Sequence, residues 1–295
     1  MKKQIPIGIY KAYMKRLLTR TIGTSLNALA HIAPGKTARI GFELFCRPMR
    51  LQINKKQKEF FDTATLDVIT HNGSPIQTYR WGTGEKKILL LHGWQSHTYR
   101  WKSYIEALKE EYSVYSIDAP AHGLSGGKLL NVPLYSEVIE KQITHLGALD
   151  AVVTHSLGAF STLYTAYRNP DLKVNKIIAL ASPGEAQEFF DFFRNTLNLS
   201  KRTTILVTEY FQKTFQKTPD YFSAPAFASA VKIPGLIIHD EGDPETPFYH
   251  AERIHKAWKN SRLIQTKGLG HNLRSPEVLN YVVDFIKEPL LVNSQ

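Results

Sequence analysis

Three kinds of side chain in this sequence could together carry out nucleophilic catalysis. Ser156 lies in the stretch "VVTHSLGAF", between branched apolar residues and small ones. A serine hydroxyl is a poor nucleophile near pH 7, so it needs a histidine that accepts and returns a proton. That histidine needs a carboxylate, which fixes the ring tautomer and stabilises the charged ring.

A purely structural role for Ser156 has to be weighed against this one. Serine is a favoured N-cap residue, so a serine that follows a strand often does no more than start a helix. The stretch around Ser156 fits both roles. The choice therefore depends on which other residues the fold brings to it.

The fold is predicted from eight short apolar runs. Helix-length segments lie between most of them, and the Asn72-Gly73 pair predicts a hairpin between the first two runs. This alternation predicts an α/β protein with a mostly parallel eight-stranded sheet, helices on both faces and an antiparallel edge. The runs are residues 66–70, 76–81, 87–91, 112–117, 151–154, 176–181, 235–239 and 262–266.

Polar or glycine-rich loops follow five of these predicted strands. They read "HGWQS", "DAPAHGLSGG", "HSLGA", "DEGDPETP" and "KGLGHN" in chain order. Catalytic groups of such sheets lie at the carboxyl ends of the strands. With these loops in this order, the chain from about residue 64 to its end resembles the α/β-hydrolase family. The resemblance implies the α/β-hydrolase fold with a small helical cap.

The resemblance also implies the roles of the site residues. Ser156 would be the nucleophile, Asp243 the acid and His271 the base, in the chain order of this family. The backbone N–H groups of Trp94 and Leu157 would form the oxyanion hole. The family pattern around the nucleophile is G-x-S-x-G. Here a threonine at position 154 replaces the first glycine.

Other ionisable residues of the same loops receive lesser roles. Asp240 is the reserve candidate for the acid, whereas Glu241 and Glu245 are expected to face solvent. By resemblance, Asp118 organises the floor of the site and His92 makes hydrogen bonds under the oxyanion loop. His155 is expected in the wall of the site, and His239 is expected to be satisfied by its neighbours.

The segment from about 184 to 232 interrupts the strand alternation where the family inserts its cap. It is rich in phenylalanine and tyrosine. Most of these rings are expected to form the core of a helical subdomain. The remainder would line an apolar pocket above Ser156.

These features predict a serine hydrolase that cleaves an ester or thioester of an apolar small molecule, a carboxylic ester hydrolase without metal or organic cofactor. Two alternatives stay open. The same triad serves carbon–carbon bond cleavage in this family, and a binding or scaffold protein could use the same fold. The sequence offers no nucleic-acid recognition module.

The basic charge is confined to the first 60 residues. They hold thirteen Lys and Arg against two acids, which accounts for the whole net charge of +11. Residues 1–60 are therefore read as a basic helical extension, and residues 61–295 as the catalytic domain. Lys11, Lys15, Arg16 and Arg20 alternate with apolar residues at roughly helical spacing, a pattern compatible with an amphipathic helix on an anionic membrane surface. The alternative is a helix packed on the catalytic body with its charged ends in water.

The location of the protein is predicted from the apolar content of the extension and from the number of cysteines. No apolar stretch of the extension is long enough to span a bilayer, and a signal peptide is poorly supported. Cys46 is the only cysteine, which fits a reducing compartment. We therefore expect a cytoplasmic protein with a peripheral membrane contact as an open possibility.

Overall fold

The computed structural model describes residues 7–289, with side chains from Leu18 onward, and divides into two compact units. The helical unit is formed by the chain up to Cys46 together with Glu185–Phe222. The sheet unit is formed by Arg47–Gly184 together with Ser223 onward.

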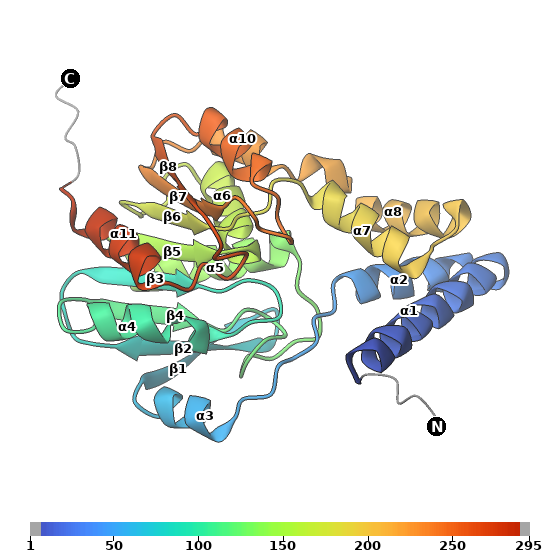
Figure 1. The fold of residues 1–295 in the computed structure, drawn as a ribbon, viewed down its shortest axis with the longest axis horizontal. Helices are drawn as coiled ribbons and strands as arrows, with labels where there is room; N and C mark the ends of the chain where they lie inside the picture. The colour runs from blue at the N-terminus through green and yellow to red at the C-terminus, as the bar shows by residue number, and fades with distance from the viewer. Residues whose placement is uncertain (1–6, 290–295) are drawn as a thin grey trace, which may run out of the picture. The chain divides into compact units, whose positions relative to one another are not determined.

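The sheet unit contains the predicted eight-stranded, mostly parallel sheet (Figure 1). Its order is β1-β2-β4-β3-β5-β6-β7-β8, with β1, β2 and β4 paired antiparallel and all other neighbours parallel. Asn72 and Gly73 take positive φ angles of 45° and 72° in the β1–β2 turn, as an Asn-Gly hairpin requires. The strands are β1 (Thr65–His71), β2 (Ser74–Trp81), β3 (Lys87–Leu91), β4 (Ser113–Ile117), β5 (Ala151–His155), β6 (Ile177–Leu180), β7 (Gly235–Asp240) and β8 (Ser261–Thr266).

Helices cover the sheet because its central strands are apolar on both faces. Every residue of β5, β6 and β7 is buried. On one face, α4 (Lys102–Leu108) and α11 (Pro276–Lys287) share a core with alternate residues of the strands, such as Ile88 and Leu90. The helices α5 (Val132–Leu146), α6 (Leu157–Arg168), α9 (Ala224–Ala228) and α10 (Tyr249–Ala257) contact one another in succession.

Two short segments join the sheet unit although they flank the helical one in sequence. Phe60 and Phe61 of α3 (Lys55–Phe61) pack against Trp81 and Tyr79. Phe227 packs against aromatic rings of α6. Residues 47–60 and 223–232, which the sequence analysis grouped with the extension and the cap, therefore belong to the sheet unit.

The helical unit combines the N-terminal extension with the inserted segment. In it, α1 (Ile7–Ile32) contacts α2 (Pro34–Phe45), α7 (Ala186–Leu197) and α8 (Lys201–Phe215), and α2 packs along α8. A Cβ atom at Gly23 would lie 1.6 Å from the carbonyl oxygen of Leu197, so α1 and α7 touch at this point through their backbones. The Asn27 side chain donates to Asn198 O (3.0 Å) and accepts from Ser200 N (2.8 Å).

The predicted membrane-facing side of the extension is only partly described. The side chains of Lys11, Lys15 and Arg16 lie outside the described residues, whereas Arg20 is exposed. Within the described part of the chain, no helix has the length and apolarity to cross a membrane.

Candidate active site

Ser156 lies at a sharp turn between β5 and α6. Its backbone has φ 53° and ψ −124°, a region that non-glycine residues rarely occupy. The Ser156 side chain makes no capping hydrogen bond to α6. An N-cap role would require that hydrogen bond, so the structure does not favour a purely structural role for Ser156. The strained backbone of Ser156 is typical of a functional residue.

Small residues make this turn possible. A Cβ atom at Gly93 would lie 2.7 Å from Ser156 Cβ, and one at Gly158 would lie 2.7 Å from the carbonyl oxygens of Leu91 and His92. Thr154, which replaces the family's first glycine, is fully buried and donates to the carbonyl oxygen of Ile178 (2.6 Å). The threonine is therefore accommodated because its hydroxyl pairs with the neighbouring strand.

The fold brings Ser156, His271 and Asp243 together from three loops. The Ser156 hydroxyl lies 3.0 Å from His271 Nε2, and His271 Nδ1 lies 2.8 Å from Asp243 Oδ2. This arrangement gives the ring one nitrogen to accept the serine proton and another to donate to the carboxylate. His271 and Asp243 are buried, whereas Ser156 is partly accessible.

Asp243 is held in its charged form by several donors. Its Oδ1 accepts from the N–H groups of Glu245 (2.8 Å) and Thr246 (3.0 Å), and its Oδ2 accepts from the Thr246 hydroxyl (2.7 Å). Burial by itself raises the pKa of Asp243, but hydrogen bonds from His239, His271 and Thr246 outweigh it and lower the pKa. A charged carboxylate is what orients and stabilises a catalytic histidine.

The reserve acid, Asp240, has a different set of partners. Its carboxylate accepts from the Thr266 hydroxyl (3.0 Å), Leu269 N (2.9 Å) and Gly242 N (3.1 Å). Burial alone would raise the pKa of Asp240, but these hydrogen bonds outweigh burial and the pKa is lowered. Asp240 thus ties two site loops together and has no described contact with His271.

The two glutamates of the acid loop differ in position. Glu241 pairs with Lys267 at 2.9 Å on the surface. The Glu245 side chain is 67% exposed, yet its Oε2 lies 3.8 Å from His271 Nε2, the nitrogen that faces Ser156. Glu245 is thus exposed, as expected, but its proximity to His271 was not predicted from the sequence.

The two residues predicted to supply the oxyanion hole, Leu157 and Trp94, belong to segments that adjoin the Ser156 turn. Leu157 is the first residue of α6, where the helix dipole favours negative charge. Trp94 follows Gly93, whose backbone lies against Ser156. Neither N–H donates to any acceptor within residues 7–289.

Two histidines hold the loop that carries Trp94. His92 donates through Nδ1 to Gly93 O (2.8 Å) and accepts through Nε2 from Ala119 N (2.9 Å). His122 donates through Nδ1 to Pro120 O (2.9 Å) and accepts through Nε2 from Gln95 N (3.0 Å). Burial lowers the pKa of both rings, which stay neutral and keep an acceptor nitrogen.

His155 and Asp118 also have structural partners. His155 donates through Nε2 to the carbonyl oxygen of His271 (2.8 Å), and its ring meets the His271 ring edge-on. Burial lowers the pKa of His155, so this neighbour of the triad is neutral. The buried Asp118 accepts from Thr98 N (2.9 Å), Tyr79 OH (2.8 Å) and Leu124 N (2.8 Å), so it ties together the segments beneath the site.

The part of the chain that contains Ser156, Asp243 and His271 also matches known proteins. The model of the alpha/beta hydrolase family matches residues 88–280, about two thirds of the sequence. The chain belongs to this family. It is 22% identical over 249 residues to the uncharacterized hydrolase YugF of Bacillus subtilis (strain 168), covering 69% of this chain and 91% of YugF.

Two other curated relatives match a shorter part of this hydrolase. The soluble epoxide hydrolase of Corynebacterium sp. (strain C12) is 31% identical over 124 residues, 39% of this chain and 43% of that enzyme. The pimeloyl-[acyl-carrier protein] methyl ester esterase of Edwardsiella ictaluri (strain 93-146) is 26% identical over 102 residues, 34% of this chain and 38% of the esterase.

Solved structures share the fold over most of the chain. A putative lipase from Acinetobacter baumannii AYE has a TM-score of 0.61 at 16% identity, covering 81% of this chain and 97% of the lipase. A membrane phospholipase A has a TM-score of 0.60 at 14% identity, covering 95% of this chain and 100% of that one. At these identities the likeness concerns the fold.

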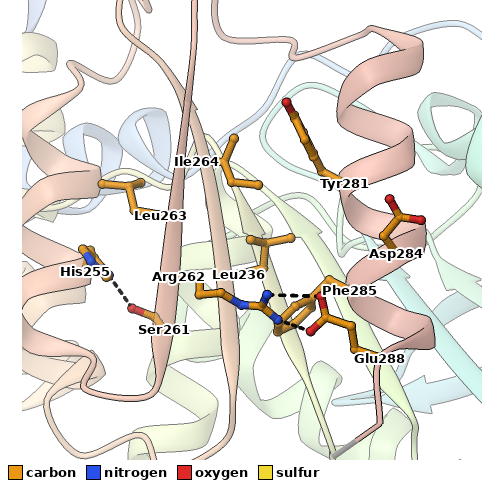
Figure 2. Close-up of a pocket in the computed structure, with 10 residues that line it drawn as sticks. All are labelled: Leu236, His255, Ser261, Arg262, Leu263, Ile264, Tyr281, Asp284, Phe285 and Glu288. Carbon is orange, nitrogen blue, oxygen red and sulfur yellow. Dashed lines mark hydrogen bonds and ion pairs between the residues drawn. The ribbon is translucent and has the colours of Figure 1, made fainter.

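A cavity of about 520 Å³ lies away from the triad, at the β8 edge of the sheet (Figure 2). Its polar lining is largely paired, because His255 Nδ1 bonds Ser261 Oγ at 2.8 Å and Arg262 pairs with Glu288. We assign no ligand to it. No group of three or more His, Cys, Asp and Glu is arranged to hold a metal ion within the described part of the chain.

Proposed function

We propose that this hydrolase is a serine esterase or thioesterase that works through an acyl-enzyme. The observation that carries the proposal is the continuous hydrogen-bonded chain from Ser156 through His271 to Asp243. A nucleophile, a base and an orienting acid within hydrogen-bond distance are the parts that acyl transfer requires. No step of this mechanism needs a metal or organic cofactor.

The geometry fits the first half of the reaction. Ser156 Oγ attacks the carbonyl carbon of the substrate while its proton passes to His271 Nε2. The charged ring is stabilised by Asp243. The negative charge on the substrate oxygen is stabilised by the N–H groups of Leu157 and Trp94.

The second half returns the enzyme to its starting state. The protonated His271 donates its Nε2 proton to the leaving alcohol or thiol, which departs with the bonding electron pair. A water molecule then gives a proton to the same nitrogen and attacks the acyl-enzyme. Collapse of that intermediate releases the carboxylic acid and restores the Ser156 hydroxyl.

We propose an apolar acyl or aromatic part for the substrate. Support comes from the aromatic residues of the inserted segment, although Phe190, Phe211 and Phe222 are buried and serve the core of the helical unit. Phe189 and Phe192 remain exposed. The esterase of Edwardsiella ictaluri is named for a pimeloyl-[acyl-carrier protein] methyl ester, which supports ester cleavage in this proposal.

We further propose a cytoplasmic location with a peripheral membrane contact through the basic extension. The single cysteine and the charge of the first 60 residues support these two proposals.

Covalent labelling and turnover test the hydrolase mechanism directly. Wild-type protein should react with a fluorophosphonate at Ser156, identified by mass spectrometry of the modified peptide, and should cleave a series of p-nitrophenyl esters of rising acyl length. Ser156→Ala should abolish labelling and lower turnover by about three orders of magnitude or more. His271→Ala should be comparably damaging, and Asp243→Asn somewhat less.

Other outcomes would favour the alternatives. A folded wild-type protein without labelling or turnover would support a binding or scaffold role. An adduct on another residue, or full turnover by folded Ser156→Ala, would contradict the nucleophile assignment.

A further inference from the structure

Glu245 introduces a negative charge on the side of His271 that reacts. Its Oε2 lies 3.8 Å from His271 Nε2, and Asp243 already occupies the other nitrogen of the ring. Among the described residues, these two carboxylates are the acidic partners of His271. Asp243 serves the triad, whereas the mechanism gives Glu245 no role.

The backbone around Glu245 is fixed by the triad itself. Its N–H donates to Asp243 Oδ1 at 2.8 Å, and the next residue, Thr246, donates to the same oxygen. Pro244 and Pro247 lie on either side and restrict the chain further. The carboxylate is therefore attached to a point whose position is set by the acid that orients His271, although the side chain itself is exposed.

The side of the ring that Glu245 borders is the leaving-group side. In acyl transfer, Nε2 hands its proton to the departing oxygen or sulfur, so that atom passes close to Nε2. A carboxylate 3.8 Å from this nitrogen must also be close to the first atoms of the leaving group. Burial and the Arg100 charge lower the pKa of His155, whose ring meets the His271 ring edge-on, so this ring is neutral.

We infer that Glu245 selects substrates by the charge of their leaving group, favouring cationic and neutral alcohols or thiols over anionic ones. This inference rests on the proposed esterase function and narrows its substrate class. Because Glu245 is 67% exposed, solvent weakens its field, and the expected discrimination per unit charge is about fivefold. The effect should fall as salt screens the exposed charge.

Four thioacetates, compared in two pairs that each differ by one charge, test the inference. Acetylthiocholine and 3,3-dimethylbutyl thioacetate differ by one positive charge, and 3-sulfopropyl thioacetate adds an anionic leaving group to be compared with butyl thioacetate. The measurement is kcat/KM for each ester in low and high salt. Wild-type protein should prefer the cationic over the neutral ester and the neutral over the anionic ester, each by about fivefold in low salt.

Two variants assign the preference to Glu245. Glu245→Gln should remove most of both preferences and their salt dependence, while the neutral esters keep their kcat/KM within about twofold. Glu241→Gln is the matched control. It removes a negative charge from the same loop, but this charge pairs with Lys267, so the variant should behave like wild type.

The outcomes separate this inference from the proposed function. Ser156-dependent turnover with charge preferences that Glu245→Gln leaves intact would overturn the inference alone. Absence of turnover of all four esters together with absence of Ser156 labelling would overturn the proposed function and this inference with it.

Discussion

At the scale of single residues, Thr246 links Asp243 and His271, two members of the proposed triad. Its hydroxyl lies 2.7 Å from Asp243 Oδ2 and 3.1 Å from His271 Nδ1, and its N–H bonds Asp243 Oδ1. Thr246 is almost fully buried, so solvent does not replace a lost contact. We therefore regard Thr246 as a positioning residue for the triad.

Thr246→Val should lower ester kcat/KM by about tenfold, since it removes one hydrogen bond to a charged group while keeping the side-chain shape. Thr246→Ser keeps the hydroxyl and should stay near the wild-type value. Steady-state kinetics and thermal unfolding of both variants check this. Equal losses in both variants would point to packing and contradict the positioning role.

The sequence carried enough information to propose Ser156, Asp243 and His271, because each follows a recognisable strand in the family's order. It did not reveal Thr246 or Glu245 as neighbours of His271. Threonine and glutamate are common in surface loops, and only the turn formed by residues 243–246 brings them to the ring. His122 lies in a predicted site loop, but its bond to Gln95 could not be predicted because Gln95 comes from another loop.

At the scale of helices and strands, the extension and the inserted segment form a single packed unit. One close approach is at Gly23, where any side chain would meet the backbone of Leu197. Gly41 of α2 approaches α8 in a similar way, with its Cβ position 2.4 Å from Val207 Cγ2. The inserted helices therefore depend on α1 and α2 for their packing.

Gly23→Ala should destabilise the helical unit by about 1–3 kcal/mol, because α1 and α7 must separate to admit the methyl group. Limited trypsin digestion should then cut faster at Arg194, Lys201 and Arg202. Gly35→Ala is the control, since nothing lies within 4 Å of its Cβ position. Unchanged cleavage in Gly23→Ala would show that this contact does not hold the helices together.

The strands could be predicted closely from the sequence, whereas this helix pairing could not. Branched apolar runs between turn signals marked β3 and β5 to within one residue of their observed bounds. Amphipathic helices such as α1 and α8 show which face is apolar but not which partner covers it. The pairing of α1 with α7 and α8 joins segments separated by more than 150 residues.

At the scale of the whole molecule, several buried histidines make stability depend on pH. Burial lowers the pKa of His92, His122 and His155 in the folded protein. In the unfolded chain they titrate near pH 6.5, so below that pH the unfolded state binds more protons than the folded state. Their neutral forms therefore contribute stability that is fully present above pH 6.5 and is lost as the pH falls.

The free energy of unfolding should fall by up to about 4 kcal/mol between pH 7.5 and 5.5, measured by urea unfolding. His122→Gln, which retains an acceptor for Gln95 N, should reduce this pH dependence by about one third. His31→Gln changes an exposed histidine and should leave it unchanged. A flat pH profile for the wild-type protein would contradict this account.

Most of the net charge of the chain, +7 of +11, lies in residues 1–46, which include α1 and α2. Residues 1–46 hold eight Lys and Arg and one acid, Glu43. The described part of α1 turns Leu26 and Ala30 inward, while Leu18 is 62% exposed and Arg20 is also exposed. Basic side chains next to exposed apolar ones favour adsorption to anionic lipid, with about 1 kcal/mol for each Lys or Arg near the surface.

We therefore expect the protein to sediment with vesicles that contain phosphatidylserine and to be released by salt, which screens the attraction. Reversing the charges of Lys11, Lys15 and Arg16 to Glu should lower the bound fraction at least tenfold at low salt. Reversing the exposed Lys86, Lys109 and Lys128 of the sheet unit makes the same change in net charge and should have a much smaller effect. Equal losses in both triple variants would mean that net charge alone attracts the protein to the vesicle. Equal binding to neutral vesicles, or none to either kind, would mean that the extension serves only the packing of the helical unit.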